Sequence, residues 1–481
     1  MKKLNLAKNT ILYTGALTMQ KVLSFLYFIV VARAIGVANT GKYSFALSFT
    51  ALFAMVLDFG LSQVIIRESA RDEEKSKKFL ANIVANKILA SLLIWGVIAV
   101  AVNLLNYPEI TRQLVYISAL VMALDSFSLT FYGVLRGHRN LQFESIGVIL
   151  NQVMVMVVGF LAIWFHLSIL FFIVAYLVGS LFNLSFSLLT LKRKLHLTPW
   201  PKFDRPILKE LFKIALPFAV AGIFVRIYSS MDIVLLSKMA NDSAVGWYSA
   251  AYKVAFALQF VGVASLAGIY PAFSAYHAES KEKLAASFVK VLKYLTLISL
   301  PLAVGVTSLA DKMIVPIFGH QYAGSIPALQ ILILCLPFSF ICFPLGAMLN
   351  ASNKQHWNMW SLGLTALVNL ILNLLLIPVL SYVGSAWASL ISYIFLFASG
   401  VFLVNKILPY PKKTLLWNFI KIGVAAVIMG LVSEFLKLKL NFMIVIPVAA
   451  VVYLALIYAF GVFRKEDWQE MKMMLFKKQI S

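Results

Sequence analysis

The chain carries little charge for its length. Only 13% of its 481 residues are charged, whereas 61% are hydrophobic, and the mean hydropathy is +0.89. Soluble domains carry about a quarter charged residues and about half apolar ones. The composition therefore excludes an ordinary soluble protein and indicates a chain that lies mostly within a membrane.

The sequence also lacks the motifs of nucleotide and metal chemistry. It contains no Walker A sequence, no GxGxxG and no HExxH, and its six histidines are scattered near predicted loops. We therefore predict no cofactor and no metal, no direct use of ATP, and no enzymatic activity. The only cysteines, Cys335 and Cys342, lie about 10 Å apart along one predicted helix, which is too far for a disulfide.

Long apolar runs dominate the rest of the sequence. Runs of about 20 apolar residues can cross a bilayer as helices. Because a backbone in lipid must satisfy its own hydrogen bonds, runs of this length predict helices rather than barrel strands. We predict an all-α polytopic membrane protein with about fourteen spans, at residues 10–34, 43–66, 79–104, 113–135, 144–165, 168–190, 212–236, 247–270, 288–309, 326–349, 358–379, 384–404, 417–436 and 441–462.

The net charge of +23 would suit a nucleic-acid partner, but the placement of the basic residues argues against one. With connections numbered alternately from the N-terminus, thirty Lys and Arg residues fall on one side and seven on the other. Such an asymmetry marks the cytoplasmic side of a membrane protein. The sequence therefore predicts a multi-pass protein of the inner or plasma membrane, with both termini in the cytoplasm and no nucleic-acid partner.

Two segments of the chain resemble each other at a constant offset of 205 residues. Residues 21–46 align without a gap on residues 226–251, which places Gly41 on Gly246 and Lys21 on Arg226. Duplicated hydrophobic units are common in transporters. Since six predicted spans precede the second unit, we expect a parallel repeat. The predicted parts are a first lobe at 1–191, a cytoplasmic linker at 192–211, a second lobe at 212–405, and two added spans with a cytoplasmic tail at 406–481.

Several stretches along the chain carry a family resemblance. They are RAIGVANTGKYSFALS, DFGLSQVIIRESAR, LPFAVAGIFVRIYSSMDIVLLSKM, IFGHQYAGSIPALQIL and LNASNKQHWN. Together they resemble polysaccharide-export flippases of the Wzx type, within the multidrug/oligosaccharidyl-lipid/polysaccharide exporter superfamily. The resemblance implies two six-helix lobes around a central cavity and alternating access. It also implies a lipid-linked oligosaccharide, joined to a polyprenyl diphosphate, as the cargo that moves from the cytoplasmic to the outer leaflet for O-antigen or other surface polysaccharide. The bilayer and other polysaccharide-assembly membrane proteins are the partners that this interpretation suggests.

Four cations within the predicted spans are candidates for substrate binding. Lys21 and Arg226 occupy equivalent positions of the repeat, and Lys87 and Lys253 lie one to two turns inside a span end. Charged residues within spans are costly and usually face a pathway. Arg can fork onto phosphate oxygens and Lys supplies a point charge, so the first pair would clamp a diphosphate. Alternatively, the pair forms salt bridges with Asp58 or Asp125, and the second pair extends its ammonium groups to the membrane surface.

Three acids within the spans are candidates for ion coupling or gating. Asp125 lies at mid-span and is a candidate proton site. Asp232 diverges by about 240° from Arg226 around their helix, so we do not expect the two to pair. Asp232 is either a coupling-ion or proton site or a structural partner of Lys253. Asp58 lies near the predicted cytoplasmic end of the second span, where it suits a gate or a fixed ion network.

Other functions remain open at this point. A drug or cation antiporter of the same superfamily would need an acidic cavity, against which the four cations argue. A lipid II flippase is a second alternative. A membrane-embedded polysaccharide polymerase or ligase would need a large outer loop, and no connection predicted outside exceeds about 16 residues.

The charge asymmetry predicts the result of a reporter-fusion experiment. Reporters fused at residues 75, 200, 410 and 475 should read cytoplasmic, and fusions at 108, 240 and 318 should read exterior, because basic connections stay inside. Paired alkaline phosphatase and fluorescent-protein fusions measure this directly. An exterior signal at residue 200 would contradict both the topology and the parallel repeat.

Overall fold

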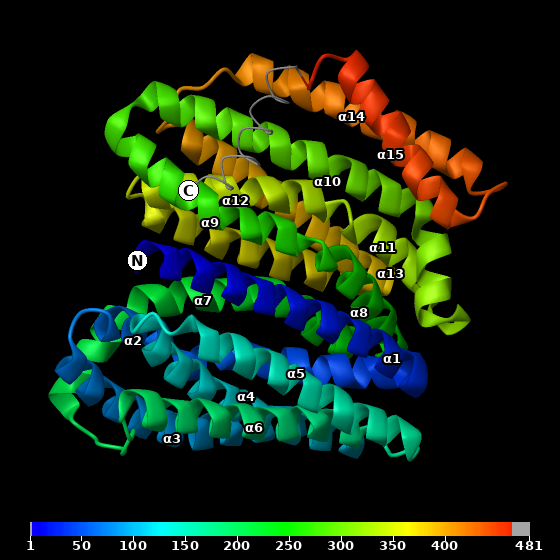
Figure 1. Ribbon diagram of the computed structural model, residues 1–481. Coiled ribbons are helices and arrows are strands. Elements are labelled where there is room, and N and C mark those ends of the chain that lie inside the picture. The colour runs from blue at the N-terminus through cyan, green and yellow to red at the C-terminus, as the bar shows by residue number, and fades with distance from the viewer. Residues whose placement is uncertain (1, 464–481) are drawn as a thin grey trace. The chain divides into compact units, whose positions relative to one another are not determined.

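The protein is almost entirely helical (Figure 1). The computed structural model describes residues 2–463, apart from the side chains of residues 2–11, 264 and 267. The predicted basic tail at 464–478 lies outside the described residues. Within them no strand is present, which confirms the all-α prediction. The helices are α1 (Lys2–Asp58), α2 (Leu61–Ser69), α3 (Glu73–Leu104), α4 (Glu109–Gly137), α5 (Leu141–Trp164), α6 (Leu170–Leu195), α7 (Arg205–Met239), α8 (Asp242–Ala257), α9 (Gln259–Glu279), α10 (Lys281–Phe318), η1 (His320–Tyr322), α11 (Ser325–Leu332), α12 (Cys335–Ala351), α13 (Gln355–Asn405), α14 (Lys412–Leu436) and α15 (Phe442–Ala459).

Two of the helices are too long to cross a bilayer once. α1 has 57 residues and α13 has 51, which correspond to about 85 and 75 Å of straight helix against a hydrocarbon core of about 30 Å. Each contains one residue with non-helical backbone angles, Gly36 (φ 79°) in α1 and Ser381 (φ 52°) in α13. Glycine adopts positive φ without steric cost. Each long helix therefore turns back on itself and supplies two passes.

The number of membrane passes follows from these bends. In the described part of the chain, 11 helices are long and apolar enough to cross a membrane, or 12 when the bent pair α8 and α9 counts as one span. This count takes α1 and α13 once each. With both of them folded into two passes, the structure holds the fourteen passes that the sequence predicts.

The second pass differs from its prediction. The sequence suggests one span over residues 43–66, but α1 ends at Asp58 and a separate helix, α2, starts at Leu61. Phe59 (φ 47°) and Gly60 (φ 72°) both have left-handed backbone angles at the break. A Cβ at Gly60 would also lie 2.8 Å from Phe218 Cβ and 3.0 Å from Ala215 O of α7, so glycine fits this position for two reasons.

Side-chain caps fix the starts of several helices. Asp72 accepts a hydrogen bond from Lys75 N at 3.0 Å and Asp204 accepts one from Ile207 N at 3.4 Å. Such caps satisfy backbone donors that a helix leaves free at its first turn. The connection before α7 is also held in place, because Asp204 N donates to Asn82 Oδ1 at 2.7 Å and Lys202 N donates to Ala81 O at 3.2 Å. The predicted linker is thus attached to α3.

By its packing the chain divides into two compact units. The first comprises residues 1–253 and 362–385, and the second comprises 254–361 and 386–481. This division does not coincide with the predicted linker, since α7 and most of α8 pack with the first unit. The predicted lobes at 1–191 and 212–405 therefore stay a prediction.

Within the first unit, α1 packs along α4, α5 and α7, and α6 lies against α4 and α5. A core at one end joins α2, α3 and α4 to the start of α7, through side chains that include Leu61, Phe79, Phe131 and Leu211. Within the second unit, α10 packs against α12 and α14, and α9 packs against α12. Tyr453 of α15 donates to Leu297 O of α10 at 2.8 Å, which anchors the C-terminal helix pair.

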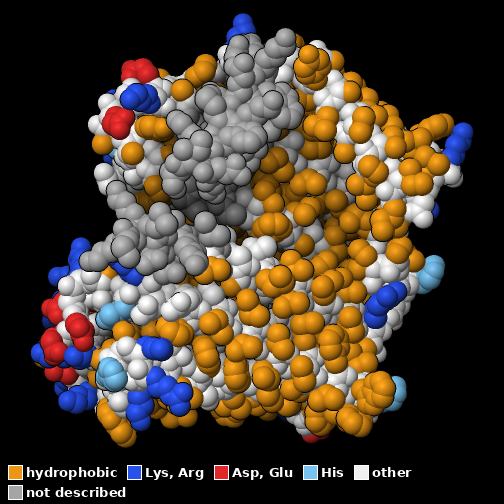
Figure 2. Space-filling view, viewed as in Figure 1, with side chains coloured by type: hydrophobic (Ala, Val, Ile, Leu, Met, Phe, Trp, Pro, Cys, Tyr) orange, Lys and Arg blue, Asp and Glu red, His pale blue; other side chains and the backbone are white. Residues whose placement is uncertain are grey.

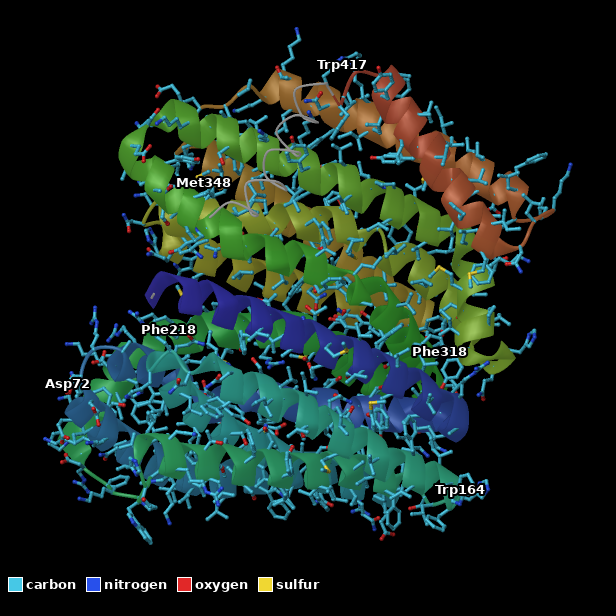
Figure 3. The ribbon with its side chains drawn as sticks, in the orientation of Figure 1. Asp72, Trp164, Phe218, Phe318, Met348 and Trp417 are labelled. Carbon is cyan, nitrogen blue, oxygen red and sulfur yellow. The ribbon has the colours of Figure 1, made fainter. Side chains whose placement is uncertain are left out.

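The surface of the first unit has the character of a membrane protein. Figure 2 shows hydrophobic side chains across its face and charged side chains gathered at the end where Figure 1 places α2. Figure 3 places Asp72 at that end and Trp164 at the opposite end. Trp164 is 78% exposed, and a Trp at a span end suits a bilayer interface.

Candidate functional site

Lys21 lies in the first half of α1 and has an exposed side chain. Its neighbour Gln20 reaches α5, where it donates to Gln152 Oε1 at 3.4 Å. Lys21 itself forms no ion pair and no side-chain hydrogen bond with any other described residue. The Lys21 ammonium group is therefore carried by a membrane-spanning helix, and no described residue supplies a negative charge to pair with it.

Lys253 of α8 faces the same side of α1 as Lys21. Its Nζ lies 5.3 Å from the centroid of the Phe28 ring, which is a cation–π contact. Phe28 follows Lys21 by two helical turns, so the two side chains point in directions about 20° apart around α1. Lys21 and Lys253 thus approach one face of α1, separated by roughly 10 Å along its axis.

Arg226 lies in the second half of α7, a helix that packs along α1. Its side chain is exposed, and its guanidinium makes no ion pair with another described residue. Its backbone carbonyl accepts a hydrogen bond from Ser229 Oγ at 3.3 Å. Three of the four predicted cations, on α1, α7 and α8, therefore lack a carboxylate partner within the described chain.

Lys87 is different, because it is fully buried and fully paired. Its Nζ lies 2.7 Å from Asp58 Oδ1, 2.9 Å from Ser126 O and 2.8 Å from Ser126 Oγ. Ser62 also donates to the Asp58 carboxylate. The group links α1, α2, α3 and α4 at the break after Asp58, so Asp58 is paired with Lys87 and not with Lys21 or Arg226. Its contacts are those of a fixed ion network.

Asp232 is the centre of a second buried network. Tyr248 donates its hydroxyl to Asp232 Oδ2 at 2.6 Å, and Asn373 donates Nδ2 to Oδ1 at 2.8 Å. Ser385 then donates to Asn373 Oδ1 at 2.8 Å, and Asn369 Oδ1 lies 3.3 Å from Asn373 Nδ2. The network joins α7, α8 and α13 and supplies a hydroxyl donor and an amide donor to one carboxylate.

Sequence reasoning identified Asp232 but did not connect it to these partners. Asn369 and Asn373 recur four residues apart in an apolar run, and Tyr248 belongs to the repeated segment. Amides at this spacing share one helix face, which is the signal that could have found them. Their pairing with Asp232 depends on three helices and is not visible in the sequence.

Asp125 of α4 keeps an exposed surface and accepts a hydrogen bond from Ser180 Oγ of α6 at 2.6 Å. Tyr176, one turn before Ser180, accepts a hydrogen bond from the Tyr43 hydroxyl at 3.0 Å. Asp125 makes no ion pair with another described residue. Among the described residues, Asp125 thus has no cationic partner, and one hydroxyl donates a hydrogen bond to its carboxylate.

The two copies of the repeated segment meet each other directly. Asp242 O occupies the place that a Cβ on Gly41 would take, and Val37 O occupies the place that a Cβ on Gly246 would take. Asp242 follows Val37 by the same 205 residues that separate Gly246 from Gly41. The contact is thus reciprocal, as it is across a two-fold axis. We call this contact of α1 and α8 the glycine seam.

Polar and aromatic contacts flank the glycine seam. Lys42 Nζ lies 3.8 Å from Asp242 Oδ2, and both side chains are partly exposed. Lys238 donates to Leu105 O at 2.9 Å and lies 5.8 Å from the centre of the Tyr107 ring. Tyr107 in turn stacks on Phe45 of α1, with ring centroids 4.5 Å apart. The Lys42–Asp242 pair joins the two copies of the segment, and the Lys238 hydrogen bond joins α7 to the connection after α3.

Comparisons with known proteins find matches among polysaccharide biosynthesis proteins and related membrane proteins. The family model described as a polysaccharide biosynthesis protein matches residues 6–277, and the MatE model matches residues 217–375. The probable low-salt glycan biosynthesis flippase Agl15 of Haloferax volcanii is 22% identical over 77% of this chain and 77% of its own length. The teichuronic acid biosynthesis protein TuaB of Bacillus subtilis is 23% identical over 83% of this chain and 84% of its own length.

Solved structures share the fold. The lipid II flippase MurJ in an inward closed conformation matches with a TM-score of 0.77 and 16% identity, over 98% of this chain and 100% of its own. An inward-facing multidrug resistance MATE family transporter of the MOP superfamily matches with a TM-score of 0.62 and 16% identity, over 79% and 95% of the two chains. At these identities the likeness concerns the fold.

The buried ion pair predicts a pattern of stability. Lys87→Met should lower the free energy of unfolding by about 3–5 kcal/mol, because it leaves the Asp58 carboxylate buried without its cation. The double variant Lys87→Met with Asp58→Leu should recover most of that loss. Thermal unfolding of the purified protein in detergent measures both. Equal destabilisation by the single and the double variant would show that the network does not fix this end of the unit.

Proposed function

Because the chain belongs to the polysaccharide biosynthesis protein family, we propose that it is a flippase for a polyprenyl-diphosphate-linked oligosaccharide. The family model covers more than half of the chain, and two curated relatives are named for glycan flipping and for teichuronic acid biosynthesis. The cargo would pass from the cytoplasmic to the outer leaflet by alternating access. The protein would lie in the inner or plasma membrane with both termini in the cytoplasm, beside other polysaccharide-assembly proteins.

The observation that carries this proposal is the absence of counter-charges around three cations. Lys21, Arg226 and Lys253 lie in membrane-spanning helices, and none pairs with a carboxylate in the described chain. An isolated charge within a membrane is costly. A diphosphate headgroup would supply the missing negative charge, with Arg226 forking onto phosphate oxygens and the lysines acting as point charges.

The same observation separates the alternatives. A drug or cation antiporter would bring a positive charge next to three unpaired cations, which is unfavourable. A lipid II flippase would carry a diphosphate as well, so it shares the headgroup chemistry and differs in the sugar. We assign the sugar to a surface polysaccharide on the strength of the family and the curated relatives.

The acids then take different roles. We assign Asp58 and Lys87 to a fixed support, since each satisfies the other. Asp232 and Asp125 are the carboxylates left for coupling to an ion gradient. Asp232 accepts hydrogen bonds from Tyr248 and Asn373, and Asp125 accepts one from Ser180. Closing one mouth of the protein while opening the other would move the headgroup, and the lipid tail would stay in the bilayer.

Substitution of the unpaired cations tests the substrate assignment. Lys21→Ala and Arg226→Ala should reduce export to background while the protein stays in the membrane, and Lys21→Arg should keep partial export. A fixed cation is needed because the anionic headgroup loses water as it enters. Surface polysaccharide in cells that lack the native gene is the measurement. Lys421→Ala is the matched control, because Lys421 donates to Phe460 O and has no proposed contact with cargo.

The competing structural role has its own outcome. If Arg226 served only to neutralise Asp125, Arg226→Ala combined with Asp125→Ala would restore export, since neither charge would be left alone within the membrane. Rescue by this double variant would remove the main support for a diphosphate cargo.

Coupling through Asp232 predicts a separate result. Asp232→Asn keeps the size of the side chain and much of its hydrogen bonding but removes its charge, so export should fall steeply while the melting temperature changes little. Export from cells and the melting temperature of the purified protein measure the two effects. Retained export by Asp232→Asn would reduce this network to interhelical hydrogen bonding.

A further inference from the structure

The connection between α6 and α7 is fixed in position although it forms no helix or strand. It lies at the end of the first unit where Figure 1 places α2. Leu197 is buried in the core that α2, α3 and α4 share. Lys202 N donates to Ala81 O of α3 at 3.2 Å, and Asp204 N donates to Asn82 Oδ1 at 2.7 Å. The connection is therefore attached to its neighbours near both of its ends.

Two large aromatic side chains point away from this fixed backbone. Trp200 is 71% exposed and Phe203 is 62% exposed. Pro199 and Pro201 flank Trp200, and the ring of each proline fixes its own φ at about −65°. The backbone contacts and the prolines thus hold both aromatic rings on the outside of the unit.

The contacts with α3 set the depth of the connection relative to the membrane. Ala81 and Asn82 come three and four residues after Lys78, the last charged residue before the apolar run that starts at Phe79. The attachment therefore lies within about 6 Å of the point where α3 changes from charged to apolar. At this level the headgroups of a bilayer meet its hydrocarbon, and Trp side chains favour it.

The basic side chains around the two rings have no acids to balance them. The acids of this region are already engaged, since Asp204 caps α7 and Glu210 pairs with Lys75. The bases of α2 and α3 at the same end differ, because Arg67, Lys75 and Lys77 each pair with a glutamate. Between residues 192 and 210, six exposed bases form no ion pair with a described residue: Lys192, Arg193, Lys194, Lys202, Arg205 and Lys209.

These six bases together with Trp200 and Phe203 are called the linker surface. We propose that the linker surface binds the headgroups of anionic phospholipids. Clusters of Lys and Arg beside a membrane attract anionic lipid, and an exposed Trp adds an anchor at the interface. An acidic partner protein would suit the charge, but the depth of the two rings places them at the bilayer. The bound lipids hold the start of α7 at the membrane surface, whatever the protein transports.

Quenching of Trp200 fluorescence by brominated lipids tests the proposal. The purified full-length protein is placed in nanodiscs of equal parts phosphatidylglycerol and phosphatidylcholine, with bromine on the chains of one lipid or of the other. The contribution of Trp200 is the difference between the native protein and Trp200→Phe. We expect brominated phosphatidylglycerol to quench it at least about two-fold more than brominated phosphatidylcholine, and high salt to remove that preference.

Trp164 provides the matched control for this measurement. It is 78% exposed at the opposite end of the first unit, and the stretch 141–191 contains no Lys or Arg. The difference between the native protein and Trp164→Phe should therefore show equal quenching by the two brominated lipids.

A pair of charge variants separates the linker surface from the rest of this end. Lys202→Gln with Arg205→Gln should remove most of the preference of Trp200 for phosphatidylglycerol. Lys75→Gln with Lys77→Gln removes the same charge from positions that are already paired, so it should leave most of the preference intact.

Three results would overturn the proposal. Equal quenching of Trp200 by the two brominated lipids would show that the surface does not select anionic lipid. Quenching by neither lipid would place Trp200 outside the bilayer, where an acidic partner protein could cover it. Equal loss of preference in the two charge variants would show a general attraction of lipid to this end of the protein rather than binding at the linker surface.

Discussion

A charge inside an apolar span needs either a partner in the protein or a ligand, and this constraint organises the candidate site. Lys87 meets the requirement within the protein, through Asp58 and Ser126. Lys21, Arg226 and Lys253 have no carboxylate partner in the described chain. In the proposed function, an anionic headgroup would supply the negative charge that these cations lack. Binding of that headgroup would then be coupled to the stability of the helices that carry these residues.

The duplication adds a second constraint. Where two related copies meet around an axis, the same surface of each copy must be complementary to that of the other. Gly41 and Gly246 meet this condition by removing the side chain at the point of contact, and the carbonyl groups of Val37 and Asp242 fill the space. The cations Lys21 and Arg226 occupy equivalent positions of the same two segments. One duplicated stretch thus supplies both the proposed binding charges and the close contact between the two copies.

The sequence alone predicted the features that depend on composition and local order. The helical membrane fold, the fourteen passes and the family follow from hydrophobic length and from motifs along the chain. The positions of the cations were readable for the same reason. Which cation is paired was not readable, because Lys87 and Asp58 are 29 residues apart and meet only after α1, α2 and α3 have packed.

Features set by backbone geometry and by contacts between distant helices could not be predicted from the sequence either. The turns at Gly36 and Ser381 fold α1 and α13 into two passes each, yet hydropathy cannot distinguish a bend from a loop. The network of Asp232 with Tyr248 and Asn373 joins three helices, so no local pattern contains it. The division of the chain into two units at residue 253 reflects packing of α7 and α8 that no composition shift marks.

The central claim is that the unpaired cations bind the diphosphate of the cargo. The most direct test measures the affinity of the purified protein in lipid nanodiscs for a polyprenyl diphosphate, a polyprenyl monophosphate and an uncharged polyprenol of the same length. The account predicts that affinity falls as phosphates are removed and that added salt weakens binding of the diphosphate most, because the attraction is electrostatic. Equal affinity for the uncharged polyprenol and the diphosphate would contradict it.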